Sequence, residues 1–465
     1  MEANKHEASA SSADQRLGTA PLTPLIFKLA LPTALAQLVN MLYNIVDRIY
    51  VGHIPETGSL ALAGLGVTYP IIVLITAFSN LIGMGGAPRA SVAMGRGDYK
   101  TAEKILGNCI TLLIALSVAL SVVFTIFGEP VLRAFGASEN TLPYAMAYLR
   151  IYLLGTIFVQ FTLGMTPFIT NQGFAMTSMA TTCIGAVSNI ILDPIFIYGF
   201  NMGVEGAAIA TILSQALSAV WVLIFFTGKR NILRIRKQNL FPSAKTLALV
   251  LSLGVSPFLM TATECVIQLA FNTGAAAYGG DDAVAIMSIL FSVAQIANLP
   301  VQGFCQGAQP VVGFNFGARK LERVRQAFKI MLAVSMGVTT VVVGAVEILP
   351  QLFLGLFSSD ADLIALGTAP LRIYMMRSFF MGAQLACQQT FLGLGEAKIS
   401  MFVALLRKVI LLLPLSIIIP RVFGAMGLSQ LVGLYVAEPV SDIISATTCT
   451  ILFFVIDWKK LKSTT

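Results

Sequence analysis

The sequence predicts an all-α polytopic membrane protein, with twelve transmembrane helices arranged in two pseudo-symmetric six-helix lobes. Hydrophobic residues make up 56% of the 465-residue chain and charged residues only 11%, whereas soluble proteins carry about 25% charged residues. Apolar stretches long enough to cross a bilayer recur along the whole chain. The second half of the chain also repeats features of the first. A β-barrel is excluded because its strands would be shorter and would alternate apolar with polar residues.

The polar gaps between the apolar segments are short and carry turn-forming residues, so no soluble domain fits between them. Each apolar segment is read as one membrane-spanning helix of about 20 residues or more. The predicted spans are 25–51, 60–88, 104–127, 142–170, 177–200, 203–228, 246–272, 283–311, 326–349, 363–392, 398–419 and 424–456.

Basic and acidic residues alternate along the gaps, and this alternation predicts the orientation. The gaps after spans 2, 6 and 8 and the C-terminal tail are rich in Lys and Arg, whereas the alternate gaps hold mostly Asp and Glu. By the positive-inside rule both termini are cytoplasmic, which agrees with an even number of spans. We expect a multi-pass protein of the bacterial cytoplasmic (inner) membrane with an uncleaved first span. The net charge of +8 thus reflects topology, and we expect no nucleic-acid partner.

An internal repeat divides the chain into two halves of the same orientation. The matched pairs are Leu149–Tyr152 with Leu371–Tyr374, Gly173 with Gly395, Gly203 with Gly424, and Gly97 with Gly317, at shifts of 220 to 222 residues. Parallel repeats are typical of transporters whose substrate path lies between the halves. The predicted domains are a cytoplasmic N-terminal tail (1–24), an N-lobe (25–228), a basic cytoplasmic linker (229–245), a C-lobe (246–456) and a cytoplasmic C-terminal tail (457–465).

Two acids lie inside apolar spans of the first half, Asp47 in span 1 and Asp193 in span 5. A charged carboxylate in lipid costs roughly 3 kcal/mol or more, so such acids are usually functional. Asn189 lies one turn before Asp193, and Pro194 after it frees helix carbonyls. At about 1.5 Å rise per residue, Asp47, Asp193 and Thr211 of span 6 all fall in the outer half of the membrane. We therefore predict a site for Na⁺ or H⁺ at Asp47, Asn189, Asp193 and Thr211. The alternative is a structural polar cluster.

Further polar side chains are candidates for a substrate cavity. Gln37, Asn40 and Asn44 share one helix face with Asp47 in span 1. Glu264 and Gln268 share a face of span 7, and span 8 carries a stripe that includes Gln302 and Gln306. Such glutamines either line water or join helices by hydrogen bonds. The buried charges of spans 11 and 12 are expected to form ion pairs or to snorkel within the C-lobe. They are Arg407, Lys408, Glu438 and Asp442.

The sequence carries no pattern typical of an enzyme. Six scattered cysteines and two histidines form no metal-ligand spacing. Neither a P-loop nor a nucleophile elbow occurs, which favours a gradient-driven carrier over an ATP-driven pump. We expect no cofactor other than Na⁺ or H⁺ as the coupling ion, and a monomer surrounded by membrane lipids.

Several of these motifs resemble the multidrug and toxic compound extrusion (MATE) family, in particular its bacterial branch of MepA- and DinF-type exporters. The resemblance covers about residues 20–458. It is carried by Asn44-x-x-Asp47 with Gly52, Asn189-x-x-x-Asp193-Pro194, the 203–211 segment and Pro439-x-x-Asp442. It implies a V-shaped pair of lobes, a first-lobe cation site at Asp47, Asn189, Asp193 and Thr211, and a role for the span-7 acid Glu264. Span 10 has only Arg372 and Arg377 as charges, which speaks against a further cation site there.

The leading hypothesis is a cation-coupled multidrug efflux antiporter that exports amphipathic, often cationic, small molecules by alternating access. The alternative is a lipid-linked oligosaccharide flippase of related fold. A flippase needs a basic cavity for pyrophosphate, and Arg377, Arg407 and Lys408 are the candidates for it. A third reading, a membrane-embedded enzyme or receptor, has no residue cluster to support it.

Overall fold

The computed structural model describes residues 16–228, 231–358 and 360–458. These residues form helices joined by short turns, with no strand among them, so the predicted all-α class is confirmed. Ten of the helices are long and apolar enough to cross a membrane. The linker residues Lys229 and Arg230, most of the predicted N-terminal tail and the tail residues 459–465 lie outside the described ranges.

The first half of the chain forms six long helices that follow the predicted spans. Each predicted gap contains a helix end, but several helices extend beyond their apolar run by up to about two turns. The elements are α2 (Leu22–Gly52), α3 (Gly58–Gly95), α4 (Tyr99–Ala134), α5 (Leu142–Asn171), α6 (Ala175–Pro194), which continues into the π-helical turn η1 (Ile195–Gly199), and α7 (Gly203–Thr227).

The second half begins with the short helix η2 of the linker and the 74-residue helix α8, which covers two predicted spans because only Gly280 breaks it (φ 67°, ψ −156°). One predicted span, 398–419, is α12, the π-helical η3 and α13 in succession. Helix α11 covers span 10 but is not among the ten apolar helices, so the number of twelve spans stays a prediction. The elements are η2 (Lys237–Leu240), α8 (Ala244–Gly317), α9 (Leu321–Ile348), α10 (Pro350–Gly355), α11 (Ala361–Leu394), α12 (Ala397–Leu405), η3 (Leu406–Leu412), α13 (Leu413–Ala425), α14 (Gln430–Leu452) and η4 (Phe453–Asp457).

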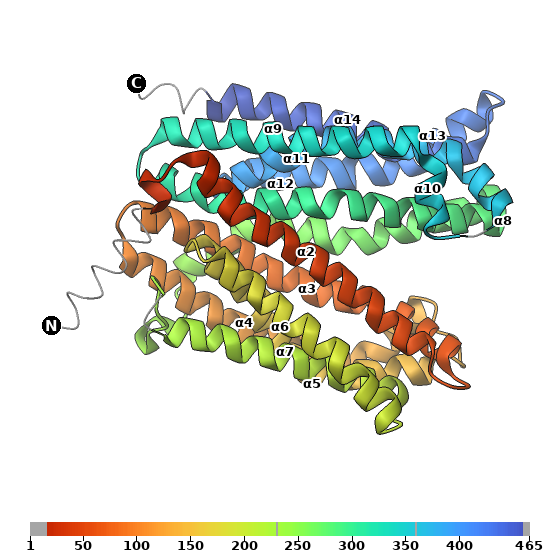
Figure 1. The fold of residues 1–465 in the computed structure, drawn as a ribbon, viewed down its shortest axis with the longest axis horizontal. Helices are drawn as coiled ribbons and strands as arrows, with labels where there is room; N and C mark the ends of the chain where they lie inside the picture. The colour runs from red at the N-terminus through yellow and green to blue at the C-terminus, as the bar shows by residue number, and fades with distance from the viewer. Residues whose placement is uncertain (1–15, 229–230, 359, 459–465) are drawn as a thin grey trace.

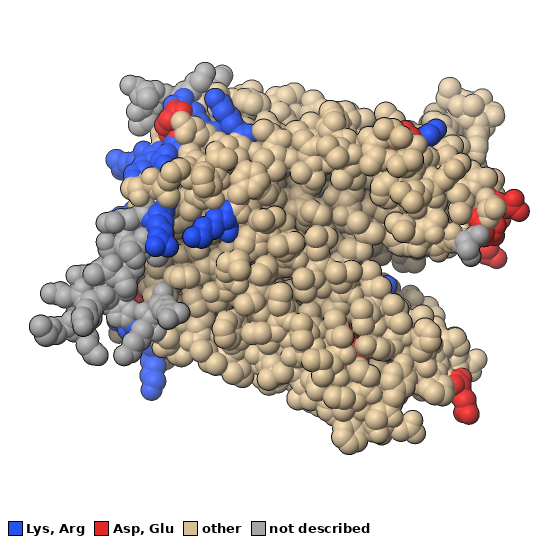
Figure 2. Space-filling view, viewed as in Figure 1, with Lys and Arg blue, Asp and Glu red and all other residues tan. Residues whose placement is uncertain are grey.

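Helices α2 to α7 form one group and α8 to α14 another, and the two groups diverge toward one end (Figure 1). The space-filling view shows the resulting cleft at the right end (Figure 2). Helices α2 and α3 of the first group pack against α8 of the second. Below, the two groups are called the N-lobe and the C-lobe.

The lobes meet through glycines at the closed end. A Cβ atom on Gly95 of α3 would overlap the carbonyl oxygen of Phe314 in α8, and one on Gly317 would overlap that of Val92. Because only glycine lets two backbones approach this closely, these positions fix the crossing of α3 and α8. Gly85 and Gly254 make the same kind of backbone contact further toward the cleft. We call these four glycines the glycine seam.

The helix ends show the internal repeat in three dimensions and correct one of its matches. Gly173 and Gly395 both adopt left-handed backbone conformations, with φ of 86° and 75°, as their pairing predicts. Gly97 (φ 77°) corresponds in the same way to Arg319 (φ 57°), and α3 and α8 end two residues earlier, at Gly95 and Gly317. The predicted pairing of Gly97 with Gly317 is therefore wrong by two residues, because two glycines at different places in the turn were matched.

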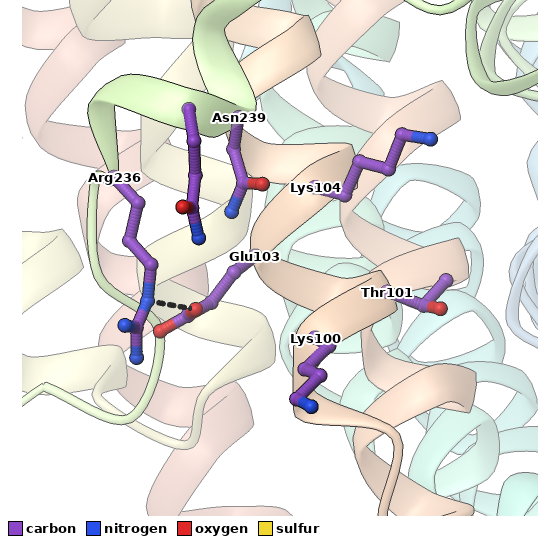
Figure 3. Close-up of a pocket in the computed structure, with 7 residues that line it drawn as sticks. Lys100, Thr101, Glu103, Lys104, Arg236 and Asn239 are labelled. Carbon is purple, nitrogen blue, oxygen red and sulfur yellow. Dashed lines mark hydrogen bonds and ion pairs between the residues drawn. The ribbon is translucent and has the colours of Figure 1, made fainter.

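Charge is distributed unevenly between the two ends. Lys and Arg side chains gather at the closed end, where α2 begins and α14 ends, and acidic side chains lie at the tips beside the cleft (Figure 2). The described part of the linker also lies at the closed end (Figure 1), and there it is fastened to α4 (Figure 3). Asn108 donates hydrogen bonds to the Asn239 and Phe241 carbonyls at 3.0 and 3.2 Å. Arg236 forms an ion pair with the buried Glu103 beside a pocket of about 350 Å³.

Candidate cation and substrate site

The structure brings together the acids that the sequence placed in the outer half of the N-lobe. Asp47 comes from α2, and Asn189 and Asp193 lie one turn apart on α6. The carboxyl groups of Asp47 and Asp193 are close enough to interact electrostatically with each other. The Asn189 amide donates to Asp193 Oδ1 at 3.1 Å. Asp193 is completely buried, and the helix widens into the π-helical η1 directly after Pro194, a distortion that is frequent at functional sites.

Three oxygens of this cluster are buried and accept no hydrogen bond within the described chain. They are Asp47 Oδ1, Asn189 Oδ1 and Asp193 Oδ2. A buried acceptor without a partner costs about 1–3 kcal/mol and requires an explanation. A bound hard cation, or protons on the carboxylates, would satisfy these oxygens. The donor set therefore fits either Na⁺ or H⁺.

Thr211 of α7 lies beside a tyrosine that faces the cluster. Its hydroxyl is close to that of Tyr148 of α5, and Tyr148 lies within electrostatic range of Asp47. Tyr43 of α2 lies within range of both Asp47 and Asp193. The sequence analysis did not identify Tyr43 or Tyr148 as neighbours of the acids. Tyr148 also stacks on Tyr152, one turn along α5, with the ring centres 6.0 Å apart. Helix spacing alone did not show which face of α5 points at the acids.

The other predicted polar residues of α2 follow the boundary between the lobes. Gln37 donates to Gln306 of α8 at 3.0 Å across that boundary. Asn40 is half-buried, and Asn44, which is exposed, donates to the Asn40 carbonyl at 2.6 Å. Gln302 of α8 is half-buried one turn before Gln306. The stripe thus begins where the lobes touch and continues outward along α2 toward Asp47.

The floor of the cleft is formed by contacts between α3 and α8. Asn80 donates to Thr261 Oγ1 at 3.1 Å, and the Phe78 and Phe258 rings lie 5.0 Å apart. Glu264 and the half-buried Gln268 lie about one and two turns further out along the Thr261 face of α8. The predicted cavity residues of span 7 therefore lie beyond the Asn80–Thr261 bond, the outermost side-chain hydrogen bond between α3 and α8 among the described residues.

The C-lobe holds a chain of buried ion pairs, and the pair of Arg407 with Asp442 confirms the ion pairing predicted between spans 11 and 12. Arg407 donates to both Asp442 oxygens at 2.6 and 3.2 Å. Arg377 pairs with Glu438 and lies 3.7 Å from Asp442. Tyr374, the repeat equivalent of Tyr152, donates to Glu438.

Glu264 is the third acid of this group of charges, although the sequence predicted it as a substrate or cation contact. Lys408 Nζ donates to Glu264 Oε2 at 2.7 Å, so the span-7 acid that was expected to contact substrate or cation also has a lysine partner. Three basic and three acidic side chains therefore balance in the C-lobe. Gln384 and Gln388 bond to serines of neighbouring C-lobe helices, so they join helices. Among the described residues, no group of three or more His, Cys, Asp or Glu side chains could hold a metal ion.

The sequence of this chain is similar to those of known proteins along most of its length. The family model MatE matches residues 32–195 and 257–418. The chain is 26% identical over 428 residues to the "Multidrug export protein MepA" of Staphylococcus saprophyticus, covering 92% of each chain. It is 26% identical to the protein of the same name from Staphylococcus aureus, covering 88% of this chain and 89% of that one.

Solved structures agree with this likeness at the level of the fold. One described as an outward-facing multidrug resistance MATE family transporter superimposes with a TM-score of 0.88 at 22% identity, covering 97% of this chain and 99% of that one. A second, described as MATE in the bent conformation, gives a TM-score of 0.89, also at 22% identity, covering 97% of this chain and 98% of that one.

Proposed function

Because this chain belongs to the MatE family, we propose that it is a multidrug efflux antiporter of the bacterial cytoplasmic membrane, driven by inward movement of Na⁺ or H⁺. It exports amphipathic, often cationic, small molecules. Two relatives that cover most of its length are named multidrug export proteins. Its ten apolar helices and its two-lobed fold agree with a transporter of this kind.

The observation that carries the proposal is the group of unpartnered oxygens at Asp47, Asn189 and Asp193. Two neighbouring carboxylates in a largely buried site attract a cation strongly, whether Na⁺ or H⁺. The neighbouring Tyr148 and Thr211 add hydroxyl oxygens beside them. The C-lobe acids, by contrast, already have basic partners, so an exchangeable ion belongs in the N-lobe.

The shape of the molecule supports alternating access as the mechanism. If the basic, closed end faces the cytoplasm, as the positive-inside rule favours, the cleft opens outward in a substrate-release state and both termini are cytoplasmic. Binding of the coupling ion at the acids lowers the free energy of one lobe arrangement relative to the other, since an ion shifts an equilibrium only by its differential affinity. Opening the inner end requires the glycine seam to separate.

The substrate surface proposed here lies between the lobes. It comprises Gln37, Asn40, Asn44, Glu264, Gln268, Gln302 and Gln306. Amides and one half-exposed carboxylate among apolar side chains suit amphipathic cations, because the amides bond without fixing one geometry and the carboxylate attracts positive charge.

The flippase alternative needs free basic side chains facing a cavity. Arg377 and Arg407 are buried and bonded to Glu438 and Asp442, and Lys408 is buried and bonded to Glu264. None of the three offers an unpaired charge to a pyrophosphate, so this observation favours the exporter.

The first prediction tests the acids directly. In a drug-sensitive bacterial strain, Asp193→Asn and Asp47→Asn should each lower ethidium efflux by at least about tenfold, because the coupling ion loses a charged ligand. Asp281→Asn, an exposed acid at the outer end, is the matched control and should transport normally. Wild-type efflux in either N-lobe variant at equal membrane abundance contradicts the proposal.

Proteoliposomes identify the ion. With a sodium gradient or a proton gradient imposed separately, one of them should drive ethidium transport in wild type and not in Asp193→Asn. Transport that needs neither gradient, or scrambling of a labelled lipid-linked sugar without ethidium transport, contradicts the antiporter.

A further inference from the structure

Lys408 and Glu264 form an ion pair whose partners differ in accessibility. The Lys408 side chain is 5% exposed and that of Glu264 is 45% exposed. The ammonium is therefore held inside the C-lobe, and the carboxylate presents its outer side to solvent. Glu264 Oε2 accepts the Lys408 hydrogen bond, and Oε1 accepts none from the described residues.

The pair lies where the lobes begin to separate. Glu264 is one turn outward from Thr261, which bonds with Asn80 across the lobes. Tyr69 of α3, with the Arg48 guanidinium 5.3 Å from its ring centre, lies within electrostatic range of Glu264. The free oxygen of Glu264 is thus available to a positively charged molecule in the cleft.

Among the described residues, the other acids near Lys408 already have basic partners. Its neighbour Arg407 is bonded to Asp442, and Arg377 is bonded to Glu438 and lies near Asp442. Burial of an unpaired ammonium is strongly unfavourable, so Lys408 keeps Glu264 as its partner. A cation that approaches Glu264 from the cleft consequently meets a carboxylate whose charge is already partly balanced.

We propose that Lys408 is a specificity-determining residue that competes with cationic substrate for Glu264 and thereby promotes release. This inference rests on the proposed function and deepens it. The pair is formed at 2.7 Å in the arrangement whose cleft is open at the acidic end. A tethered ammonium weakens cation binding in the state from which an exported cation must leave, and it leaves the binding of uncharged compounds unaffected.

Direct binding tests this without any ion gradient. The full-length protein, reconstituted in nanodiscs, is titrated with ethidium as the cationic probe and Nile red as the uncharged probe, with fluorescence anisotropy as the readout. Lys408→Gln should tighten ethidium binding about fivefold or more and leave Nile red binding unchanged. Lys408→Arg, which keeps the charge, should restore weaker ethidium binding. Lys104→Gln, at the closed end, is the matched lysine control.

A double-mutant cycle separates competition from a structural role. Glu264→Gln should weaken ethidium binding, and adding Lys408→Gln to it should give no tightening, because the contested carboxylate is gone. Glu264→Gln alone leaves the buried Lys408 ammonium without a partner and can unfold, whereas the double variant buries no unpaired charge. If Glu264→Gln unfolds, the double variant is compared with Lys408→Gln instead. The thermal transition of each variant is recorded to check that it is folded.

Three outcomes overturn the inference. They are unchanged ethidium affinity in Lys408→Gln, equal changes for both probes, and equal tightening by Lys408→Gln with or without Glu264. A failure of gradient-driven transport in the liposome assay would instead contradict the proposed function, and it would leave these binding results as they stand.

Discussion

At the residue scale, the candidate cation site is identified by buried polar oxygens that have no hydrogen-bond partner. The sequence identified Asp47, Asn189 and Asp193 because acids and amides are rare in apolar spans, and depth along the helices brought them to the same level. The pairing of Glu264 with Lys408, residues 144 positions apart, was not predictable in this way. It depends on how α8 and η3 are rotated about their axes, and the apolar periodicity of nearly uniformly hydrophobic helices does not specify that rotation.

A cap at the closed end gives a residue-scale prediction with a pH dependence. Asp98 Oδ1 accepts from the Thr101 backbone at 3.0 Å at the start of α4, and hydrogen bonds with Thr101 hold the pKa of Asp98 below its usual value. Asp98→Ala should therefore lower the free energy of unfolding by about 1 kcal/mol or less at pH 7, since the carboxylate is exposed.

The sign of the pH effect follows from the lowered pKa. The charged form is favoured by folding, so its stabilisation is complete above the unfolded pKa of about 3.9 and is lost as pH falls below it. Thermal unfolding in detergent should thus show the difference between wild type and Asp98→Ala shrinking toward about pH 3. Asp98→Asn keeps a capping oxygen without titrating. A difference between wild type and Asp98→Ala that is independent of pH contradicts this account.

At the element scale, the sequence predicted the helices well because apolar length is a strong signal for membrane spans. The predicted boundaries were less accurate, since helices such as α3 and α4 continue beyond their apolar run into polar surroundings. The π-helical turns η1 and η3 were not predicted, because they depend on local packing and no residue pattern marks them. Both occur next to the charged groups of their lobe.

The glycine seam gives an element-scale prediction. Gly95→Val or Gly317→Val should force α3 and α8 apart at the inner end, because the added side chain overlaps backbone atoms that have no room to move. Distances between spin labels on the two lobes should then lengthen at the inner end and shorten across the cleft, and efflux should fall. At Gly344 of α9 a Cβ would meet nothing within 4 Å, so Gly344→Val is the control. An unchanged distance distribution in both seam variants would refute the role of the seam.

At the scale of the whole molecule, the chain just before α2 fastens the closed end. Leu17 is buried, and Asn315 at the end of α8 donates to its carbonyl at 2.9 Å. Lys320 donates to the Gly18 carbonyl at 2.8 Å, and Arg323 of α9 donates to that of Ala20 at 2.8 Å. This segment leads into the N-lobe yet is held by the C-lobe. The sequence was read there as a cytoplasmic tail, and hydrogen bonds to backbone carbonyls leave no pattern that would have shown the contact.

Loss of one of these bonds should loosen the closed end. Arg323→Ala should raise hydrogen–deuterium exchange in residues 16–25 by about tenfold, the equivalent of roughly 1.4 kcal/mol. Arg325→Ala is the matched control, because Arg325 pairs with Glu322 on its own helix. Equal exchange in wild type and Arg323→Ala would show that the segment is held by other contacts.

The repeat has produced two halves with different chemistry. One half keeps buried oxygens without partners, which we propose receive a small mobile charge, and the other half neutralises its acids with side chains of its own. Because the proposed cation site and the Glu264–Lys408 pair sit on separate helices in separate halves, mutations at the pair can alter what the exporter carries while the proposed energy source stays the same. Selection by a new antibiotic should therefore enrich changes around Glu264 and Lys408 before it touches Asp47 or Asp193.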